Sequence, residues 1–338
     1  MCTSLKVKAV DGSIAVARTM EFPNLMQAKL TIVPRGTQGE SLSPSGSGHT
    51  WTSTHGFVGV DAFGDPQKLT DGLNEHGLYC GLLYMPGFCE YQSADGVAAD
   101  QCVTTPDLIA LVLGTCATVD EVRARMAEIV VWPWVFGPFG FAPPSHFVVH
   151  DAAGGSIVME WIDGKQVIFD NPLGVATNWP NFDWHLTNVR NYVNLHPANA
   201  TSRTIEGLEL APMGQGTGML GLPGDSSSPS RFIRAVAYTA SLRPLAGLAE
   251  AKSAAQHCIN QFDLPWGMIR DNDDAGNDDH TLWSVVADLA TPAYAIRMYD
   301  DPTWRELSLA TLDLSSGPVR QIDLPANPAF EQFALPSS

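Results

Sequence analysis

The sequence has little charge, and only a small part of that charge is positive. Charged residues make up 16% of the 338 residues, and 19 Lys and Arg stand against 36 Asp and Glu, so the formal net charge is -17. A chain this acidic repels a phosphate backbone, which argues against a nucleic-acid binder. Hydrophobic residues make up 45% of the chain, which is enough for a packed core and excludes intrinsic disorder.

The cysteines lack the spacing of a metal site. The chain has six of them, with no C-x-x-C pair and no short pairing with histidine. A chain of this length does not need disulfides to be stable, so most of the cysteines are expected to be small buried side chains in a reducing compartment. These are Cys80, Cys89, Cys102, Cys116 and Cys258.

No stretch is typical of a signal peptide or a membrane helix. The start of the chain has no basic segment leading into an apolar one, and the longest uncharged apolar stretch, 129–144, is interrupted by prolines and glycines. The sequence therefore predicts no membrane partner and a cytoplasmic location.

Alternating apolar and polar residues predict strands in groups. Residues 5–10 and 13–22 flank Asp11-Gly12 and are typical of a β-hairpin. Further strands are predicted at 28–34, three times within 145–169, and late in the chain at 283–289, 293–300 and 307–314.

Helices are predicted in pairs. One pair lies within 105–129, split near Cys116, with Thr118 and Glu121 capping its second helix; the other lies within 229–262. Runs of strands with paired helices indicate an α+β fold, in which antiparallel sheets pack against outer helices. No internal repeat or low-complexity linker divides the chain, so residues 2–338 are expected to form a single domain.

Two motif-like segments are better explained as loops. Residues 216–221 fit G-x-G-x-x-G, but Leu-Pro-Gly-Asp follows where a dinucleotide-binding helix should begin. The acidic run 271–279 has Ala275 and Leu282 where a calcium loop has ligands, so a solvated loop is favoured over weak cation binding. No G-x-S-x-G and no H-E-x-x-H pattern is present, so the histidines are interpreted as structural.

Cys2 is the residue whose position most clearly suggests catalytic chemistry. Removal of Met1 would leave a cysteine with a free α-amine, so that the thiol acts as nucleophile and the amine, with a reference pKa of about 8, as base. Arg18 lies on the paired strand, where a guanidinium favours the thiolate, and Glu21 follows three residues later. Glu21 would hold an ammonium or orient a polar group; the simpler interpretation is that Arg18 and Glu21 form an ordinary ion pair.

Several segments in order along the chain resemble the choloylglycine hydrolases, which include bile salt hydrolases and penicillin V acylases. The resembling segments are MCTSL, ART-MEF at 17–22, DGLNEHGL at 71–78, NPLGVATNWPNFDWHLTNVRNY at 171–192, GQGTGMLGLPGDSSSPSRFIRA at 214–235, DLPWGM at 263–268 and HTLWSVVADL at 280–289. This family belongs to the N-terminal nucleophile hydrolases. The resemblance implies a four-layer αββα sandwich and hydrolysis of linear amide C–N bonds without a metal or organic cofactor.

The resemblance also assigns roles to single residues. Cys2 corresponds to the nucleophile, Arg18 to the arginine beside its thiol, Asn178 to the asparagine of the oxyanion hole, and Arg231 to a late family arginine. Glu21 stands where the family typically has Asp, and its longer side chain leaves the contact with the α-amine open.

Tyr84 is a second departure from the family pattern. Bile salt hydrolases usually have Asn at the corresponding position, whereas penicillin V acylases can have Tyr. The backbone of Tyr84 would contribute to the oxyanion site.

An uncharged aromatic run is the candidate wall for the acyl part of the substrate. Met20 and Phe22 are candidates for the same wall, and a core or oligomer contact is the alternative interpretation of the run. The aromatic residues are Trp132, Trp134, Phe136, Phe139 and Phe141.

The wall and Tyr84 favour a penicillin V acylase-like or N-acyl-amide acylase, with acyl-homoserine lactones as plausible substrates, over a bile salt hydrolase. A catalytically silent homologue that binds amphiphiles is the alternative of another class. Residues 191–225 resemble the excursion that related enzymes use for assembly, so a homotetramer is expected.

Overall fold

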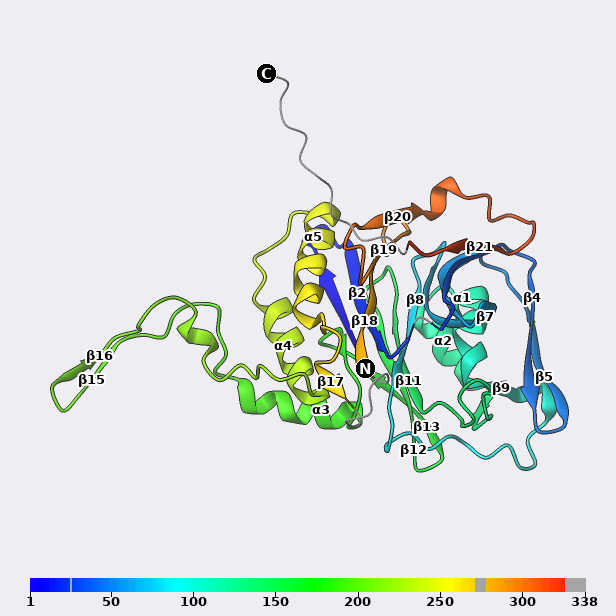
Figure 1. The fold of residues 1–338 in the computed structure, drawn as a ribbon, viewed down its shortest axis with the longest axis horizontal. Helices are drawn as coiled ribbons and strands as arrows, with labels where there is room; N and C mark the ends of the chain where they lie inside the picture. The colour runs from blue at the N-terminus through cyan, green and yellow to red at the C-terminus, as the bar shows by residue number, and fades with distance from the viewer. Residues whose placement is uncertain (25, 271–277, 326–338) are drawn as a thin grey trace, which may run out of the picture.

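The fold consists of two antiparallel sheets packed face to face, with helices on both outer faces. A computed structural model describes residues 1–24, 26–270 and 278–325. Figure 1 shows the layers edge-on, in the order helices, sheet, sheet, helices. This confirms the αββα sandwich expected from the sequence.

The first sheet carries the N-terminus of the chain. Its main strands follow the order β14-β1-β2-β18-β19-β20, and β17 pairs with β18 at one end. The strands are Cys2–Lys8 (β1), Ile14–Phe22 (β2), Val175–Ala176 (β14), Ile269–Arg270 (β17), Asp278–Asp288 (β18), Ala293–Met298 (β19) and Arg305–Ser308 (β20). β1 and β2 form the predicted hairpin, and Gly12 in its turn has a φ of 92°, which favours glycine.

The second sheet lies opposite the first and has the order β13-β12-β11-β8-β7-β6-β3-β21. Its strands are Lys29–Val33 (β3), Phe57–Ala62 (β6), Asp65–Asn74 (β7), Tyr79–Tyr84 (β8), Ser145–His150 (β11), Ser156–Ile162 (β12), Lys165–Asp170 (β13) and Arg320–Asp323 (β21). The three strands predicted within 145–169 are therefore confirmed.

Two helix pairs cover the outer faces. Leu108–Thr115 (α1) and Val119–Met126 (α2) pack on the second sheet, and Thr118 caps α2 by accepting a hydrogen bond from the Glu121 N–H. Ser228–Ala240 (α4) and Leu248–Ile259 (α5) pack on the first sheet, next to Phe182–Asn188 (α3). Buried apolar side chains fill the space between the two sheets and beneath each helix layer.

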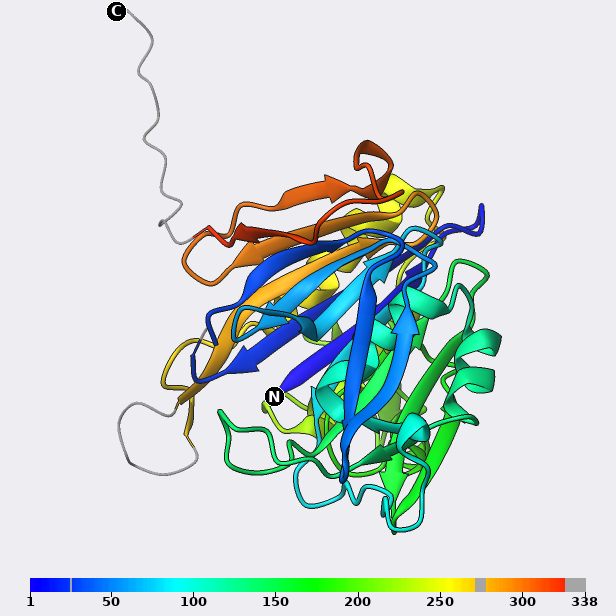
Figure 2. The same ribbon diagram turned by 90° about the vertical axis from the view of Figure 1, so that its right-hand side faces the viewer.

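Three two-stranded ribbons lie outside the main sheets. They are Gln38–Ser43 (β4) with Gly46–Thr52 (β5), Cys102–Thr104 (β9) with Val130–Trp132 (β10), and Arg203–Ile205 (β15) with Leu208–Leu210 (β16). In Figure 2 the β4–β5 hairpin, in blue, lies toward the viewer. The β15–β16 ribbon stands at the tip of the 191–225 excursion, which projects far from the body in Figure 1.

The structure corrects the sequence-based prediction at one late strand. Residues 307–314 were expected to form a strand, but β20 ends at Ser308 and Leu309–Thr311 form a 3-10 turn. Leu309 is buried while its neighbours are not, which suits a turn that dips into the core rather than an alternating strand. Residues 217–219 of the G-x-G-x-x-G segment form a short 3-10 turn, as expected for a loop.

Among the described residues, no helix is long and apolar enough to span a membrane.

Candidate active site

Cys2 begins β1 and is held between the two sheets. It pairs with Met20 on β2, and only 2% of its surface is exposed. The sulfur lies 3.9 Å from the Met20 sulfur and 3.5 Å from Nη2 of Arg18. The hairpin register therefore brings together the thiol and the guanidinium that the sequence pairs only by proximity.

Arg18 reaches the thiol from within the protein interior. The side chain is fully buried, and Nη2 also donates to the Leu82 carbonyl at 2.6 Å, whereas Nη1 donates to Asp71 at 2.5 Å. Burial opposes the charged form of Arg18, but the neighbouring anionic forms of Cys2 and Asp71 more than offset it, so its pKa is raised. The guanidinium stays charged beside the sulfur. The ion pair between Arg18 and Glu21, given above as the alternative interpretation, is not formed, because Arg18 pairs with Asp71.

Asn178 and Arg231 surround the backbone of Cys2. The Cys2 N–H donates to Oδ1 of Asn178 at 2.9 Å, and Nη2 of Arg231 donates to the same oxygen at 2.5 Å. Nη1 of Arg231 donates to the Cys2 carbonyl at 2.5 Å and to the Thr3 hydroxyl at 2.7 Å. Nδ2 of Asn178 donates to the Tyr84 carbonyl at 2.7 Å. Four of the residues chosen from the sequence thus meet at one end of β1.

The local chain explains why Asn178 reaches Cys2. β14 pairs with β1 through Ala176 and Ser4, so Asn178 follows directly at the end of the sheet next to Cys2. The Ser228 hydroxyl at the start of α4 accepts from the Asn178 N–H at 2.9 Å. The ring of His146 lies 2.9 Å from the Thr177 carbonyl. These contacts fix the backbone from both sides.

Glu21 lies on the opposite face of β2 from Arg18. Successive side chains of a strand point to opposite faces, and Glu21 is three residues beyond Arg18. Glu21 therefore faces the α4 layer rather than the sulfur. Oε1 accepts from the Thr281 hydroxyl at 3.0 Å. Burial raises the pKa of the Glu21 carboxyl, and the charges of the terminal amine and Arg231 counter this in part.

Met1 precedes Cys2 and is held at the end of β2. Its amine donates to the Glu21 carbonyl at 2.9 Å and to Oδ2 of Asp279 at 3.1 Å, and its own carbonyl accepts from the Glu21 N–H. Only 8% of the surface of Met1 is exposed. The Met1 ammonium therefore contacts the backbone carbonyl of Glu21 and the carboxylate of Asp279. The contact expected between the Glu21 carboxylate and the Cys2 α-amine involves a different nitrogen and stays a prediction.

Most of the aromatic run forms a cluster that reaches β2. Phe22 lies two residues beyond Met20, on the same face of the strand, and its ring centroid is 5.7 Å from that of Phe139. Ring contacts at 5.3 to 5.7 Å extend from Phe139 through Phe136 to Trp134, and from Phe139 to Phe141. A continuous apolar path therefore leads from the Cys2 sulfur through Met20 and Phe22 into the run.

Trp132 does not join this cluster through any ring contact among the described residues. It belongs to β10, and its indole N–H donates to the Leu42 carbonyl on the β4–β5 hairpin at 2.8 Å. Its position beside Trp134 in sequence suggested a shared wall, but the hairpin contact ties it to a different part of the fold.

Sequence reasoning missed several residues of the site region. Phe63 stacks edge-on with Phe136 at 5.2 Å and with Phe139 at 5.4 Å, and Asp71 bonds Arg18. Phe63 has a φ of 60° in the turn between β6 and β7, which no sequence pattern marks. Asp71 is the first residue of the DGLNEHGL segment, which resembles the family, but the resemblance assigned no role to Asp71.

The remaining cysteines are free thiols. Burial raises the pKa of Cys89 and of Cys258 to about 11, and it raises the pKa of Cys80, Cys102 and Cys116 as well. Thiols with raised pKa values are poor nucleophiles at neutral pH.

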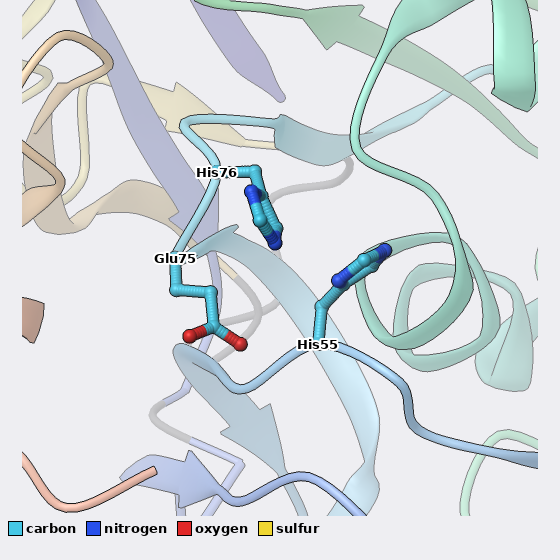
Figure 3. A group of neighbouring side chains, drawn as sticks. All are labelled: His55, Glu75 and His76. Carbon is cyan, nitrogen blue, oxygen red and sulfur yellow. The ribbon is translucent and has the colours of Figure 1, made fainter. Parts of the chain in front are cut away.

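His55, Glu75 and His76 form the candidate metal group in the described part of the chain. Figure 3 shows the two imidazole rings converging, with the carboxylate of Glu75 below them. The ring centroids are 4.5 Å apart, but both oxygens of Glu75 accept hydrogen bonds from the Arg35 guanidinium, and Oε1 also accepts from the Gly56 N–H at 2.6 Å. A carboxylate already bound by a cation is a poor metal ligand, so we assign no metal to this group. Residues 271–277 of the acidic loop lie outside the described residues.

Residues 2–325 match the family model of the linear amide C–N hydrolases, choloylglycine hydrolase family. The chain belongs to the choloylglycine hydrolase family. Its members hydrolyse non-peptide C–N bonds of linear amides, and this chain is such a hydrolase.

Among curated relatives of this family member, a bile salt hydrolase/transferase from Lactiplantibacillus plantarum is 30% identical, over 95% of this chain and 97% of that protein. A penicillin V acylase from Pectobacterium atrosepticum is 28% identical, over 92% of this chain and 81% of that protein. The crystal structure of a conjugated bile acid hydrolase mutant, C2A, from Clostridium perfringens has a TM-score of 0.86 and 24% identity, covering 98% of this chain and 99% of that one. The last likeness concerns the fold alone.

Proposed function

We propose that this hydrolase uses Cys2 as its nucleophile after removal of Met1. The observation that carries the proposal is the convergence at the end of β1. The Cys2 sulfur lies 3.5 Å from Arg18, and its nitrogen lies 2.9 Å from Oδ1 of Asn178. Loss of Met1 would turn that nitrogen into an amine and would uncover the buried thiol, so one residue would supply both nucleophile and base.

In the acylation step, the Cys2 sulfur attacks the carbonyl carbon of the substrate amide. The proton of the thiol passes to the α-amine, and negative charge develops on the carbonyl oxygen. Asn178 has two Nδ2–H bonds, of which one is directed to the Tyr84 carbonyl. The other N–H, with a backbone N–H near Tyr84, would stabilise the oxyanion. The α-ammonium then protonates the leaving nitrogen, the C–N bond breaks, and a thioester remains.

In the deacylation step, water replaces the amine as the second reactant. The α-amine takes a proton from the water, whose oxygen attacks the thioester carbonyl, and the C–S bond breaks to release the acid. Arg18 stabilises the thiolate that leaves. Arg231 holds the Cys2 carbonyl and Oδ1 of Asn178, so it keeps the amine and the oxyanion donor in one geometry. These steps require no metal and no organic cofactor.

The position of Glu21 favours an electrostatic role near the amine rather than a direct part in the reaction. Its carboxylate is buried on the α4 side of β2, bonded to Thr281, and the charge of the terminal amine acts on it. Once Met1 is removed, this negative charge would favour an ammonium at Cys2.

The aromatic cluster supports substrates with an apolar acyl group. The path from Met20 through Phe22 to Phe139 begins at the sulfur, so an acyl chain bound to Cys2 would lie along it. Phenoxyacetyl and fatty acyl groups fit such a surface. We therefore favour a penicillin V acylase-like or N-acyl-amide acylase, and acyl-homoserine lactones are substrates of the same chemical type.

Hydrolysis of conjugated bile acids is the second candidate. Curated relatives at 30% and 31% identity are bile salt hydrolase/transferases, which is a closer likeness than the 28% of the penicillin V acylase. A steroid would also pack on an aromatic wall. The net charge of -17 slows the approach of both anionic bile salts and penicillins, so charge does not separate the two candidates.

The decisive experiment compares three classes of substrate in one panel. Purified protein is incubated with penicillin V, with glycine- and taurine-conjugated bile acids, and with N-acyl-homoserine lactones, and the released amines are quantified. We expect the highest kcat/KM for penicillin V or a fatty acyl amide. Release of glycine or taurine with a higher kcat/KM would instead establish a bile salt hydrolase.

The nucleophile is tested by substitution and by mass. Intact mass should show that Met1 is absent, and Cys2→Ala should lower kcat by at least about 1000-fold. Cys258→Ala, which removes a buried thiol on α5, is the matched control and should retain activity. An active Cys2→Ala protein would rule out the nucleophile, and activity in protein that retains Met1 would rule out the α-amine as base.

The projecting excursion supports assembly into a homotetramer. Between residues 191 and 225, Val193, Leu208, Met213 and Leu220 are each at least 65% exposed, and apolar side chains at this density are typical of contact surfaces. The four layers of the sandwich would form a single catalytic domain in each subunit. Light scattering of the intact chain and of a variant that lacks residues 200–215 would measure the subunit number. We expect four subunits and one, respectively.

The cysteines support a reducing cytoplasm as the location, because Cys2 must remain a free thiol for the proposed reaction.

A further inference from the structure

Arg18 has a buried acidic partner that the proposed reaction does not involve. Arg18 and Asp71 are both fully buried, and Nη1 of Arg18 donates to Oδ2 of Asp71 at 2.5 Å. The other terminal nitrogen, Nη2, faces the Cys2 sulfur at 3.5 Å. One guanidinium therefore joins the sulfur on one side to a carboxylate on the other.

Asp71 approaches Arg18 from the opposite sheet. It lies on β7 in the second sheet, whereas Arg18 lies on β2 in the first. Its second oxygen, Oδ1, accepts a hydrogen bond from the Tyr294 hydroxyl on β19, which again belongs to the first sheet. Asp71 is thus held by two donors of the facing sheet, one of which is the guanidinium beside the nucleophile.

A glycine leaves room for this arrangement. Gly81 on β8 is the partner of Asp71 across the strand pair. A Cβ at position 81 would lie 3.3 Å from Cδ of Arg18 and 3.1 Å from Oη of Tyr79, which is tighter than ordinary contact. The side chain of Arg18 therefore passes over a position where the second sheet carries no side chain.

The two charges depend on each other because water is excluded. Burial raises the pKa of the Asp71 carboxyl, and the Arg18 charge and the Tyr294 hydrogen bond lower it again. A buried carboxylate without a partner would be protonated or displaced, and a buried guanidinium without a partner would seek another anion. The pair therefore acts on the sulfur as a unit, with its positive end toward Cys2.

We propose that Asp71 is a positioning residue for the nucleophile: its carboxylate anchors the Arg18 guanidinium beside the sulfur and offsets part of the positive charge that favours the thiolate. This inference rests on the proposed function, in which Cys2 is the nucleophile. It explains why an arginine with no access to solvent remains in place next to a thiol.

Other charged or titratable groups also surround the sulfur and its backbone, and they remain in place when Asp71 is changed. They come from the N-terminus, β2, β8, β18, β19 and α4, and they are the terminal amine, Glu21, Tyr79, Asp279, Tyr294 and Arg231. Among the described contacts, Asp71 is the carboxylate that bonds the guanidinium touching the sulfur. Substitution of Asp71 therefore measures the effect of this one carboxylate on Arg18.

The test measures the ionisation of Cys2 directly. The rate of Cys2 alkylation by iodoacetamide is followed from pH 5 to 10 by mass spectrometry of the N-terminal peptide, in wild-type protein and in Asp71→Asn. The Asn side chain keeps an oxygen that accepts from Nη1 but has no charge. We expect the midpoint of the alkylation profile to fall by about one pH unit, because the charge of Arg18 is no longer offset. An unchanged or higher midpoint overturns the proposal.

Two controls separate this effect from general damage to the core. Asp61→Asn removes the charge of another fully buried aspartate, which accepts from the Thr31 hydroxyl at 2.6 Å on the second sheet, and it should leave the midpoint unchanged. Tyr79→Phe removes a buried hydroxyl close to Arg18 that makes no hydrogen bond among the described residues, and it should also leave the midpoint unchanged.

Tyr294→Phe decides the question if Asp71→Asn does not fold. Without the hydroxyl, Asp71 is less well stabilised as an anion, so the midpoint should fall in the same direction by a smaller amount. An unchanged midpoint in a folded Tyr294→Phe protein overturns the proposal.

The readout distinguishes this inference from the proposed function. If alkylation of Cys2 in wild-type protein leaves amide hydrolysis intact, the nucleophile assignment fails, whatever Asp71 does. If alkylation abolishes hydrolysis and the midpoint of Asp71→Asn is unchanged, only the role of Asp71 fails.

Discussion

The two faces of β2 differ in what they hold. On the face toward the second sheet, Arg18, Met20 and Phe22 follow one another at every second position, and they lead from the sulfur of Cys2 to the aromatic cluster. On the face toward α4, Thr19 and Glu21 alternate with them. Thr19 accepts from the Thr3 N–H at 3.2 Å, and Glu21 accepts from Thr281.

The difference separates the reacting atoms from the atoms that hold them. The inner face presents the sulfur, the guanidinium and an apolar path, which are the groups that would touch an acyl substrate. The α4 face presents hydrogen bonds that fix the backbone of β1, with Arg231 as the link between Cys2, Thr3 and Asn178. One strand can therefore serve chemistry and framework because its side chains alternate.

After loss of the nucleophile itself, the largest effect is expected at Asn178, where the two faces meet. Asn178→Ala removes the proposed oxyanion donor and the acceptor for the Cys2 nitrogen, so kcat should fall by about 100- to 1000-fold. Steady-state kinetics on the best substrate measures the loss. Asn171→Ala, a buried asparagine earlier in the same segment, is the matched control. A variant of Asn178 with wild-type kcat would contradict the assignment.

The second effect concerns the framework behind Asn178. His185 on α3 is buried against Phe232, with centroids 4.6 Å apart, and burial, followed by the charge of His146, lowers its pKa to about 4. The unfolded chain, with an ordinary histidine pKa of about 6.5, binds more protons in this window. The free energy of unfolding should therefore fall by about 3 kcal/mol as the pH drops from about 6.5 to 4.

Urea denaturation at several pH values measures this loss. His185→Phe keeps the aromatic stack and should flatten the dependence, whereas His257→Phe changes an exposed histidine on α5 and should leave it as in the wild type. An equally steep dependence in His185→Phe would show that another group, such as the fully buried His150, is responsible.

The third effect tests the apolar path on the inner face. Phe139→Ala removes the ring that contacts Phe22, Phe63, Phe136 and Phe141, so kcat/KM for a phenoxyacetyl amide should fall by about 10- to 100-fold relative to an acetyl amide. Trp132→Phe removes the hydrogen bond to Leu42 outside the cluster and should not change this ratio. Equal changes in both variants would place the acyl group elsewhere.

The smallest effect is expected on the α4 face. The Thr281 hydroxyl donates to Glu21 and accepts from the Leu264 N–H at 2.9 Å. Thr281→Val should therefore lower the free energy of unfolding by about 1–2 kcal/mol, measured by urea denaturation. The pH profile of Cys2 alkylation should stay as in the wild type. A shifted profile would mean that the α4 face contributes to the reactivity of the thiol after all.

Much of the fold follows from patterns that short segments carry. The hairpin with its Asp11-Gly12 turn, the three strands within 145–169, and the Thr118 cap are local features, and the structure confirms each of them. The strand predicted at 307–314 was wrong because its buried Leu309 belongs to a turn. The ribbons and β6–β8 were not predicted. β6 is buried along its whole length, β15 and β16 are exposed along theirs, and the buried positions of β4 hold Gly and Ser, so no alternation of apolar and polar residues marks these strands.

The sequence by itself determined the acidic composition, the layered α+β architecture, the family resemblance and the pairing of Cys2 with Arg18, because these depend on local alternation, turn residues and ordered motifs. The tertiary structure alone decided that Asp71 and Tyr294 bond across the two sheets to the guanidinium, that Phe63 joins the aromatic cluster, and that Trp132 leaves it. The physical reason is that contacts between sheets depend on how the layers stack, and no pattern along a single strand specifies which side chains meet across the gap.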